Sequence, residues 1–522
     1  MAVVEDYIAD SDDEDPAPSE QAYLNARSYE PARDVPAKCT HTLDASIKGL
    51  SMNELLERLS VPLEFQKAQL AAQLSDEQVF ATQSKITSVL REVADRLDVQ
   101  GSRDVTAEDQ SARKKYVLDT KAYAFITRFR AINTAPDDAL ITPEMTSLVN
   151  NILKSIKEPI DTSHNLLIDL KSIFSGNPHP ELSLDSGRRL IRPIGGDAGR
   201  SDMFEEQRWK DTWGVWNSLR WCVEALPTQE IVDYIPLILP PLLILMDDYE
   251  ASYRIRGLQI LPSFLRIPPP VLHRTGIAQL LLRSIQHSIS LHTTPPEPLL
   301  LEPSFSQLFQ LLHTLYPEGQ GKEEEVAKNV EQAVERGIIN GWAYSQSGRD
   351  GVESSIGVAR AVELVCRESG LGVIRWMKTF IPSLIYPLTI PPAPYIVPLQ
   401  YANLQALHTL LATIEKTGRA VRWRGEILNG IGILLVALSE RGVSDALDGG
   451  KFTNSVGLGR STGKVGQGAA IELIQGERQD QLQDLLVFCK EIISDLVKVA
   501  PSMKTVEIPA LIDLDPVAFG FL

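Results

Sequence analysis

Cysteine is scarce in this chain of 522 residues, which contains four: Cys39, Cys222, Cys366 and Cys489. More than a hundred residues separate each cysteine from the next. This spacing excludes the disulfide framework of a small secreted protein and a closely spaced zinc site, and it is typical of a reducing compartment. The N-terminus is acidic, whereas a secretory or mitochondrial signal is basic and apolar. The sequence therefore predicts a cytoplasmic or nuclear protein.

Long hydrophobic runs are missing as well. The longest apolar run, from Ile235 to Met246, has twelve residues and includes three prolines. A membrane-spanning helix needs about 20 apolar residues, so we expect no contact with a membrane. Segments of alternating apolar and polar residues rich in Val, Ile and Thr, the pattern of a half-buried strand, are almost absent. Their absence argues against a sheet-based fold.

Positive charge is in deficit. The chain holds 51 Lys and Arg against 68 Asp and Glu, a net charge of −17. Nucleic-acid affinity depends on neutralising phosphates with Lys and Arg, so a general nucleic-acid binder is not expected. Eight of the acids lie in residues 1–20, which leaves −9 for the rest of the chain. A local basic contact at Arg188, Arg189 and Arg192 therefore stays open.

Catalytic motifs are also lacking. We find no zinc-protease helix, nucleophile elbow or dinucleotide-binding fingerprint. The Gly-rich stretch 457–465 resembles a phosphate-binding loop, but Leu458 and Val465 stand where that loop requires Gly and Ser or Thr. We therefore expect no catalytic residue, no metal and no cofactor, and we predict that the protein is not an enzyme.

What the chain does contain is helical periodicity from about residue 45 to its end. Apolar residues recur at steps of three and four, and Pro or Gly interrupts them every 10 to 20 residues or so. Ser75, with Gln78 three residues later, predicts a capping box at a helix start. The division that follows is a disordered acidic tail (1–45), an N-terminal helical region (46–202), a HEAT-like α-solenoid (203–441), a flexible Gly-rich insertion (442–468) and a C-terminal helical segment (469–522).

A helix pair is clearest at residues 228–266, and a third helix is expected from about 271 to 291. A single core stops growing near 250–300 residues, so a stack of helix pairs fits this length better than one bundle. Stacked pairs of about 40 residues describe HEAT-like repeats. The predicted fold class is therefore all-α, an α-solenoid of HEAT-like helical repeats with a disordered acidic N-terminal tail.

The turn between the paired helices is rich in acids. We expect Asp247 to cap the second helix, with Glu250 completing a capping box and pairing with Arg254. A magnesium site at Asp247 and Asp248 would need a third ligand, which is not evident.

Just upstream, Trp209, Trp213 and Trp216 share one face of an expected helix over 203–226. Large aromatics at this spacing usually fill a core, so we favour packing over base stacking.

The acidic tail contains Ser11 followed by Asp12, Asp13 and Glu14. A serine followed by acids is what acidophilic kinases of the casein-kinase-two type accept, so Ser11 is the phosphorylation candidate. A phosphorylated acidic strand can be read by a Lys/Arg pocket on a partner. The alternative is a tail that only aids solubility.

The stretch from Leu239 to Glu250, continuing to Arg254 and Gly257, resembles the signature of the Tel-two-interacting protein two family. In that family an apolar helix led by Pro-Pro runs into an Asp-Asp-Tyr turn, and a basic residue and a Gly follow in the next helix. The residues that this resemblance and the turn geometry make candidates for partner binding are Pro240, Pro241, Asp247, Asp248, Tyr249, Arg254 and Arg256.

The resemblance implies a non-enzymatic scaffold of the TTT co-chaperone complex. Its partners would be the larger solenoid subunit, Tel-two-interacting protein one, and Tel-two itself. With the ninety-kilodalton heat-shock chaperone, that complex supports the maturation and stability of the PI-kinase-related kinases, including TOR and the DNA-damage checkpoint kinases. The alternative is a helical-repeat adaptor for transport or trafficking.

Overall fold

The structure is a computed structural model that describes most of the chain. The described residues are 47, 50–66, 74–97, 118–130, 140–156, 158–176, 178–183, 187–190, 203–204, 207–291, 298–319, 321–345, 349–441 and 467–520. The predicted acidic tail with Ser11, residues 442–466 of the predicted insertion, Cys39 and Arg192 lie outside these ranges.

The N-terminal helices begin where local capping chemistry places them. Ser75 and Gln78 form the predicted capping box, because each side chain bonds the other residue's backbone N–H. The Thr142 hydroxyl accepts a hydrogen bond from the N–H of Met145 at the start of the helix that begins at Pro143. The helices of this part are α3 Met52–Glu57, α4 Leu63–Gln66, α6 Asp76–Arg96, α7 Thr120–Thr127, α8 Pro143–Lys154 and α9 Pro159–Phe174.

The middle of the chain contains the expected helix pair. Its elements are η1 Arg208–Asp211, α11 Val215–Ala225, α12 Ile235–Met246, α13 Ala251–Phe264, α14 Pro269–Thr275, α15 Ile277–Ile289, α16 Pro298–Leu315, α17 Glu323–Ala333, η2 Val334–Ile339 and α18 Asn340–Tyr344. The single helix expected over 271–291 is wrong. Gly276 has a φ of 74° and separates α14 from α15, because only Gly adopts the left-handed region without strain.

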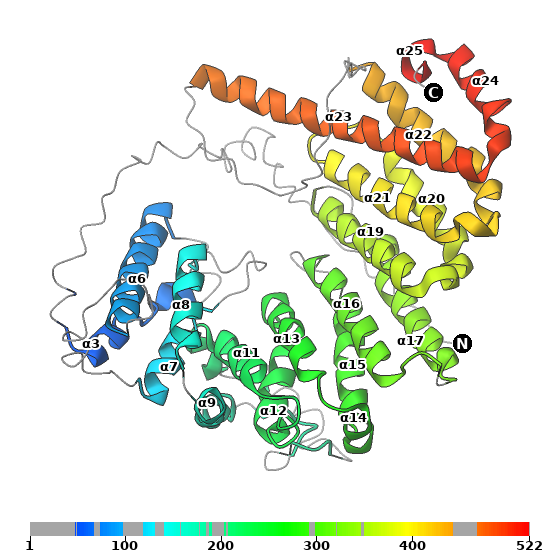
Figure 1. Cartoon of the computed structure of the whole chain (residues 1–522). Coiled ribbons are helices and arrows are strands. Elements are labelled where there is room, and N and C mark those ends of the chain that lie inside the picture. Colours follow the sequence, from blue (N-terminus) through cyan, green and yellow to red (C-terminus); the bar gives the residue numbers. More distant parts are fainter. Residues whose placement is uncertain are drawn as a thin grey trace, which may run out of the picture.

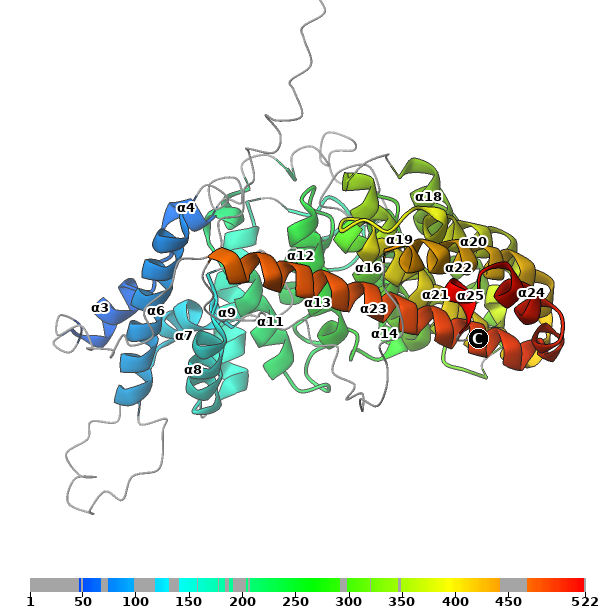
Figure 2. The same cartoon turned by 90° about the horizontal axis from the view of Figure 1, so that it is seen from above.

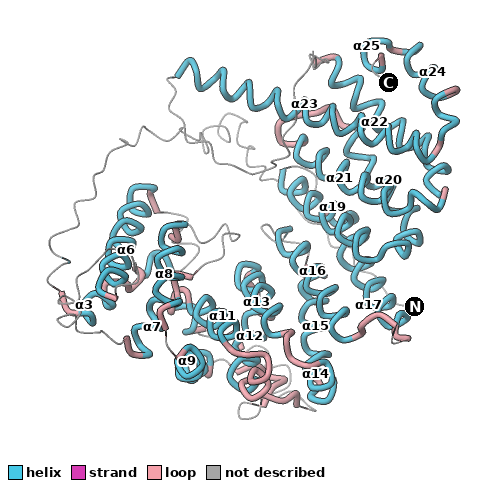
Figure 3. The backbone as a smooth tube through the Cα atoms, viewed as in Figure 1, coloured by secondary structure: helices cyan, strands magenta, loops and turns pink. Residues whose placement is uncertain are grey.

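The C-terminal part continues the helical pattern. Its elements are α19 Arg349–Ser369, η3 Gly370–Trp376, α20 Met377–Ile385, η4 Tyr386–Thr389, α21 Val397–Ile414, η5 Glu415–Thr417, η6 Arg419–Trp423, α22 Arg424–Ser439, α23 Gln467–Val499, η7 Pro501–Lys504, α24 Glu507–Leu514 and α25 Pro516–Phe519. In the described part of the chain there is no strand, and the one β-bridge joins Leu182 to Arg189. Figure 3 shows that the described residues form helices and the loops that connect them.

The helices form two layers along a curved path, which confirms the predicted all-α solenoid (Figure 1). One layer is α11, α13, α16, α19, α21 and α23, in which each helix packs against the next. The other layer includes α9, α12, α15, α20 and α22. Successive helices pair across the layers, as in α12 with α13, α15 with α16, and α22 with α23. The domain boundaries proposed from the sequence stay predictions. Helix α9, from the predicted N-terminal region, packs against both α11 and α12 of the predicted solenoid region.

The hydrophobic core follows the stack rather than forming a single centre. Buried apolar side chains connect from Ile47 to Phe519 without a break between clusters, as expected where each helix pair covers its neighbours. The long helix α23 packs against α21 and α22. Its first half projects back across the open side of the arc, toward the N-terminal helices (Figures 1 and 2). No helix in the described ranges combines the length and the apolar content needed to cross a membrane.

Candidate partner-binding site

The site begins with α12, whose sequence is apolar on all sides. Ten of its residues are buried, including Pro240 and Pro241 inside the helix. An interior proline lacks the N–H of the helical ladder, so this helix depends on its surroundings. It packs against α9, α13 and α15. Gly187, in the loop after α9, lies so close that a Cβ there would stand 2.8 Å from the Cα of Pro236.

Asp247 and Asp248 follow α12, and Asp247 does not cap α13 as the sequence suggested. The N-cap position of α13 is Glu250, whose side chain makes no cap bond, so the predicted capping box is wrong. Asp247 is the C-cap of α12, and its carboxylate lies 3.0 Å from Nε2 of His179. Asp248 stabilises the turn before α13, because its Oδ1 accepts a hydrogen bond from the Glu250 N–H at 2.9 Å.

Asp248 is fully buried and anchors a polar cluster. Its Oδ1 lies 2.9 Å from Nζ of Lys210, and its Oδ2 accepts from Nε2 of Gln207 at 2.8 Å. The Lys210 ammonium also pairs with Glu250 at 2.6 Å. Burial raises the pKa of Asp248 above its ordinary value even though Lys210 lowers it. Removal of the carboxylate from water therefore outweighs the attraction of Lys210.

Asp247 behaves in the opposite way. Burial disfavours its charge, but the combined effect of His179, Ser284 and Arg254 outweighs burial, so the pKa of Asp247 lies below its ordinary value. His179 lies in the loop after α9, so this contact fastens that loop to the turn between α12 and α13. No pattern in the sequence pointed to His179 as a partner.

The two arginines of the candidate set are buried structural residues. Arg254 is 3% exposed and donates to the carbonyl of Asp248 and, at 3.1 Å, to the Ser288 hydroxyl of α15. It thereby joins the turn to the next pair of helices. The guanidinium of Arg256 lies 3.9 Å from the centroid of the Trp216 ring, a cation–π contact made in a desolvated site.

The tryptophans confirm the core interpretation but not the expected helix. Trp209, Trp213 and Trp216 are all buried. Residues 203–226 are not one helix: Trp209 lies in η1, and Gly214, with a φ of 76°, precedes α11. A Cβ on Gly214 would stand 2.8 Å from the carbonyl oxygen of Arg128, so this close approach requires Gly.

Around Lys210 the aromatic rings form a cluster. Its ammonium lies 4.0 Å from the ring centroid of Tyr249 and 4.5 Å from that of Tyr253. The ring of Trp209 stacks on Phe174 at 5.2 Å and meets Tyr253 edge-on at 4.9 Å. The ammonium that pairs with Asp248 therefore also lies against the rings of Tyr249 and Tyr253.

Burial narrows the predicted partner-binding set. Pro240, Pro241, Asp248, Arg254 and Arg256 are buried within the chain. Tyr249 is 59% exposed and Asp247 is partly exposed. These two are therefore the members that a partner can reach directly.

A second exposed aromatic, which the sequence did not single out, extends this surface. Phe204 is 38% exposed, and its ring meets that of Tyr249 edge-on at 6.1 Å. A groove of about 400 Å³ adjoins the pair and is lined by Phe204, Asp247, Glu181 and Arg283, among others. Arg283 and Glu181 form an ion pair at its rim. We name Tyr249, Phe204 and this groove the junction surface.

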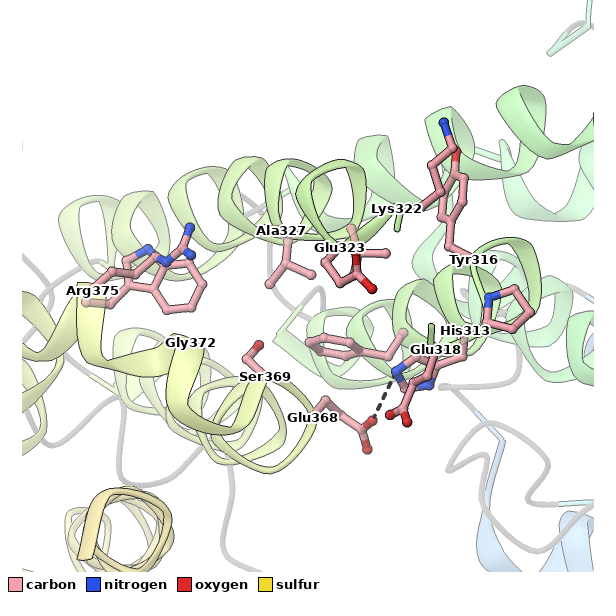
Figure 4. A pocket seen from close by; sticks show the side chains of 15 residues that line it. His313, Tyr316, Glu318, Lys322, Glu323, Ala327, Glu368, Ser369, Gly372 and Arg375 are labelled. Atoms are coloured by element: carbon pink, nitrogen blue, oxygen red, sulfur yellow. Dashed lines mark ion pairs between the residues drawn. The ribbon is translucent and has the colours of Figure 1, made fainter. Parts of the chain in front are cut away.

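A second hollow, of about 250 Å³, lies between α16, α17 and α19 (Figure 4). Phe309, Val326 and Trp376 contribute apolar lining, and His313 faces Glu368 at 4.0 Å. The scattered histidines of the sequence gave no signal for this hollow, because it forms only where α16, α17 and α19 pack together.

Within the described residues, the remaining candidates add no site. Arg189 donates to Gln279, while Ser11 and the Gly-rich stretch lie outside the described residues. Cys222, Cys366 and Cys489 are buried free thiols, and burial raises the pKa of each. Within the described ranges, no group of three or more His, Cys, Asp or Glu could hold a metal.

Comparison with known proteins adds one match. The model of the Tti2 family matches residues 130–394, about half of the chain, from just after α7 to the loop before α21. This range includes the α12–α13 pair and the junction surface. No curated protein and no solved structure matches the chain.

Proposed function

Because this chain belongs to the Tti2 family, its role lies in the TTT complex, and we propose that it acts there as a non-enzymatic scaffold. The proposed partners are Tel-two-interacting protein one and Tel-two. The proposed outcome, together with the heat-shock chaperone, is the maturation and stability of the PI-kinase-related kinases. The observation that carries this proposal is the family match over residues 130–394, which falls on the two-layer helical stack.

The mechanism that we propose is surface complementarity at the junction surface. Aromatic side chains are enriched at binding hot spots, and Tyr249 and Phe204 present two adjacent rings there. The buried cluster below them holds the turn in place: Asp248 bonds the Glu250 N–H, and Lys210 bridges Asp248 and Glu250. A surface that is already ordered loses less conformational entropy on binding.

The test is co-purification of tagged variants from cells, with identification of partners by mass spectrometry. We expect the wild-type chain to recover Tel-two-interacting protein one and Tel-two. Tyr249→Ala should recover much less of both while keeping the wild-type melting curve, because its side chain is mostly exposed. Tyr344→Ala is the matched control, since Tyr344 is exposed to a similar extent but lies outside the junction surface.

Two results would contradict this proposal. Recovery of transport factors in place of TTT subunits would favour a transport or trafficking adaptor. Full recovery of both subunits by Tyr249→Ala would remove the junction surface from the proposal. We also propose a cytoplasmic location with a nuclear fraction, which fluorescence microscopy of the tagged chain tests directly.

A further inference from the structure

A second surface lies at the Pro-rich connector between α20 and α21, which includes η4. The sequence places five prolines within residues 386–398, and this spacing favours an extended link. In the structure, hydrogen bonds hold the connector against α21. The side chain of Gln400 is fully buried, and its Nε2 donates to the carbonyls of Pro387 at 3.3 Å and Ile390 at 2.7 Å. The connector is therefore a fixed part of the surface.

Two tyrosines on this connector point into solvent. Tyr386 is 69% exposed and Tyr395 is 55% exposed. An exposed aromatic ring on a fixed backbone offers a large contact area, and little conformational entropy remains to be lost on binding. The two tyrosines lie near opposite ends of the connector, and both line the same groove.

The groove that Tyr386 and Tyr395 line has a volume of about 640 Å³. Trp342, Pro382 and Pro387 contribute to its lining, and Ser345, Ser355 and Ser383 add hydroxyl groups. None of the described residues that line it is charged, although 23% of the chain is Asp, Glu, Lys or Arg. The groove of the junction surface and the hollow in Figure 4 both carry charged side chains. An uncharged occupant therefore fits this groove without leaving a charge desolvated and unpaired.

A buried amide lines the same groove. Asn403 is 1% exposed, and its Nδ2 donates to the carbonyl of Leu399 at 2.8 Å. This bond fixes the orientation of the amide, and no described residue gives the Oδ1 atom a hydrogen-bond partner. A buried carbonyl oxygen left without a donor is costly. A ligand that brings one N–H to this place would satisfy it.

We propose that this groove binds an uncharged, proline-rich segment of a partner protein in the polyproline II conformation. Grooves lined by aromatic side chains are the recurrent docking surface for such segments, which are extended before they bind. Trp342, Tyr386 and Tyr395 supply the aromatic walls. Because prolines have no N–H, the donor to Asn403 comes from a residue between prolines.

The test uses the full chain and a fluorescein-labelled peptide, Pro-Pro-Pro-Leu-Pro-Pro-Pro, followed by fluorescence anisotropy. We expect saturable binding that is weakened about tenfold or more by Tyr386→Ala or Tyr395→Ala, as for the loss of a hot-spot aromatic. Both side chains are exposed, so both variants should fold, and their melting curves check this. Tyr344→Ala, exposed but outside the groove lining, should bind as the wild type does.

Two altered peptides separate the contributions. Replacing every proline with alanine removes the polyproline II preference and should abolish binding. Methylating the leucine nitrogen removes the only backbone N–H between prolines and should weaken binding, because Asn403 then stays unsatisfied. This second peptide tests the buried amide without altering the protein.

Several outcomes would overturn the inference. These are no saturable binding, equal binding of the alanine peptide, or wild-type affinity in both tyrosine variants. Equal binding of the methylated peptide would refute the role of Asn403. If the peptide bound only after removal of residues 1–45, the occupant would be the chain's own tail rather than a partner. The assay contains no other TTT subunit, so its outcome is independent of the function proposed above.

Discussion

Asp248 offers the sharpest test of the junction, because its charge and its hydrogen bonds can be separated. Burial raises the pKa of this carboxyl despite Lys210, so its charge adds little net stability, as is common for buried ion pairs. Its hydrogen bonds from Lys210, Gln207 and the Glu250 backbone should instead carry the stabilisation. We therefore expect Asp248→Asn to be mild and Asp248→Ala to be severe.

The magnitudes follow from the contacts. A hydrogen bond contributes about 1 kcal/mol, and one to a charged group about 1.5–3 kcal/mol. Asp248→Ala removes three acceptor contacts, but Lys210 keeps Glu250 at 2.6 Å, so we expect a loss of about 3 kcal/mol in the free energy of unfolding. Asp248→Asn retains an oxygen acceptor for Glu250 and Lys210, and Gln207 can rotate its amide to match. Its expected cost is about 1 kcal/mol.

Urea denaturation followed by tryptophan fluorescence measures both variants, since Trp209, Trp213 and Trp216 lie in or beside this cluster. The double variant Asp248→Ala with Lys210→Met is the internal check. It should recover part of the loss, because it no longer leaves a buried ammonium with half its partners. If Asp248→Asn proved as costly as Asp248→Ala, the charge would carry the stabilisation and the reasoning would be refuted.

Two further predictions concern packing and thiol chemistry. Gly257→Ala should cost about 1–3 kcal/mol, because a Cβ there would stand 2.7 Å from Cγ and 2.9 Å from the backbone nitrogen of Met246. Gly425→Ala, with nothing within 4 Å of its Cβ, is the matched helical control and should be neutral or slightly stabilising in the same urea titration. Burial raises the pKa of the Cys366 and Cys489 thiols to about 12. These thiols should stay unreactive toward Ellman's reagent at pH 8 until the chain is unfolded, and rapid labelling of the folded chain, located by peptide mass spectrometry, would contradict this.

The helix start at Ser75 and the fold class were predictable from the sequence because they depend on local chemistry. The capping box at Ser75 needs residues three positions apart, and the apolar periodicity of 228–266 needs only a helix and a neighbour. Breaks at left-handed glycines were missed: Gly214 and Gly276 resemble any other Gly in sequence. Whether a Gly continues a helix or ends it depends on the close contacts around it, such as that of Gly214 with Arg128.

The candidate site shows the same division. By itself the sequence determined the apolar helix, the acidic turn that follows it and the aromatic stretch upstream, because composition and spacing carry that information. Only the tertiary structure decided that Asp248 faces inward to Lys210, that Arg254 reaches Ser288 and that Tyr249 stays outside. The reason is that side chains separated by 30 or more residues meet only when the helix pairs stack, and burial, which sets both charge and exposure, is a property of that stack.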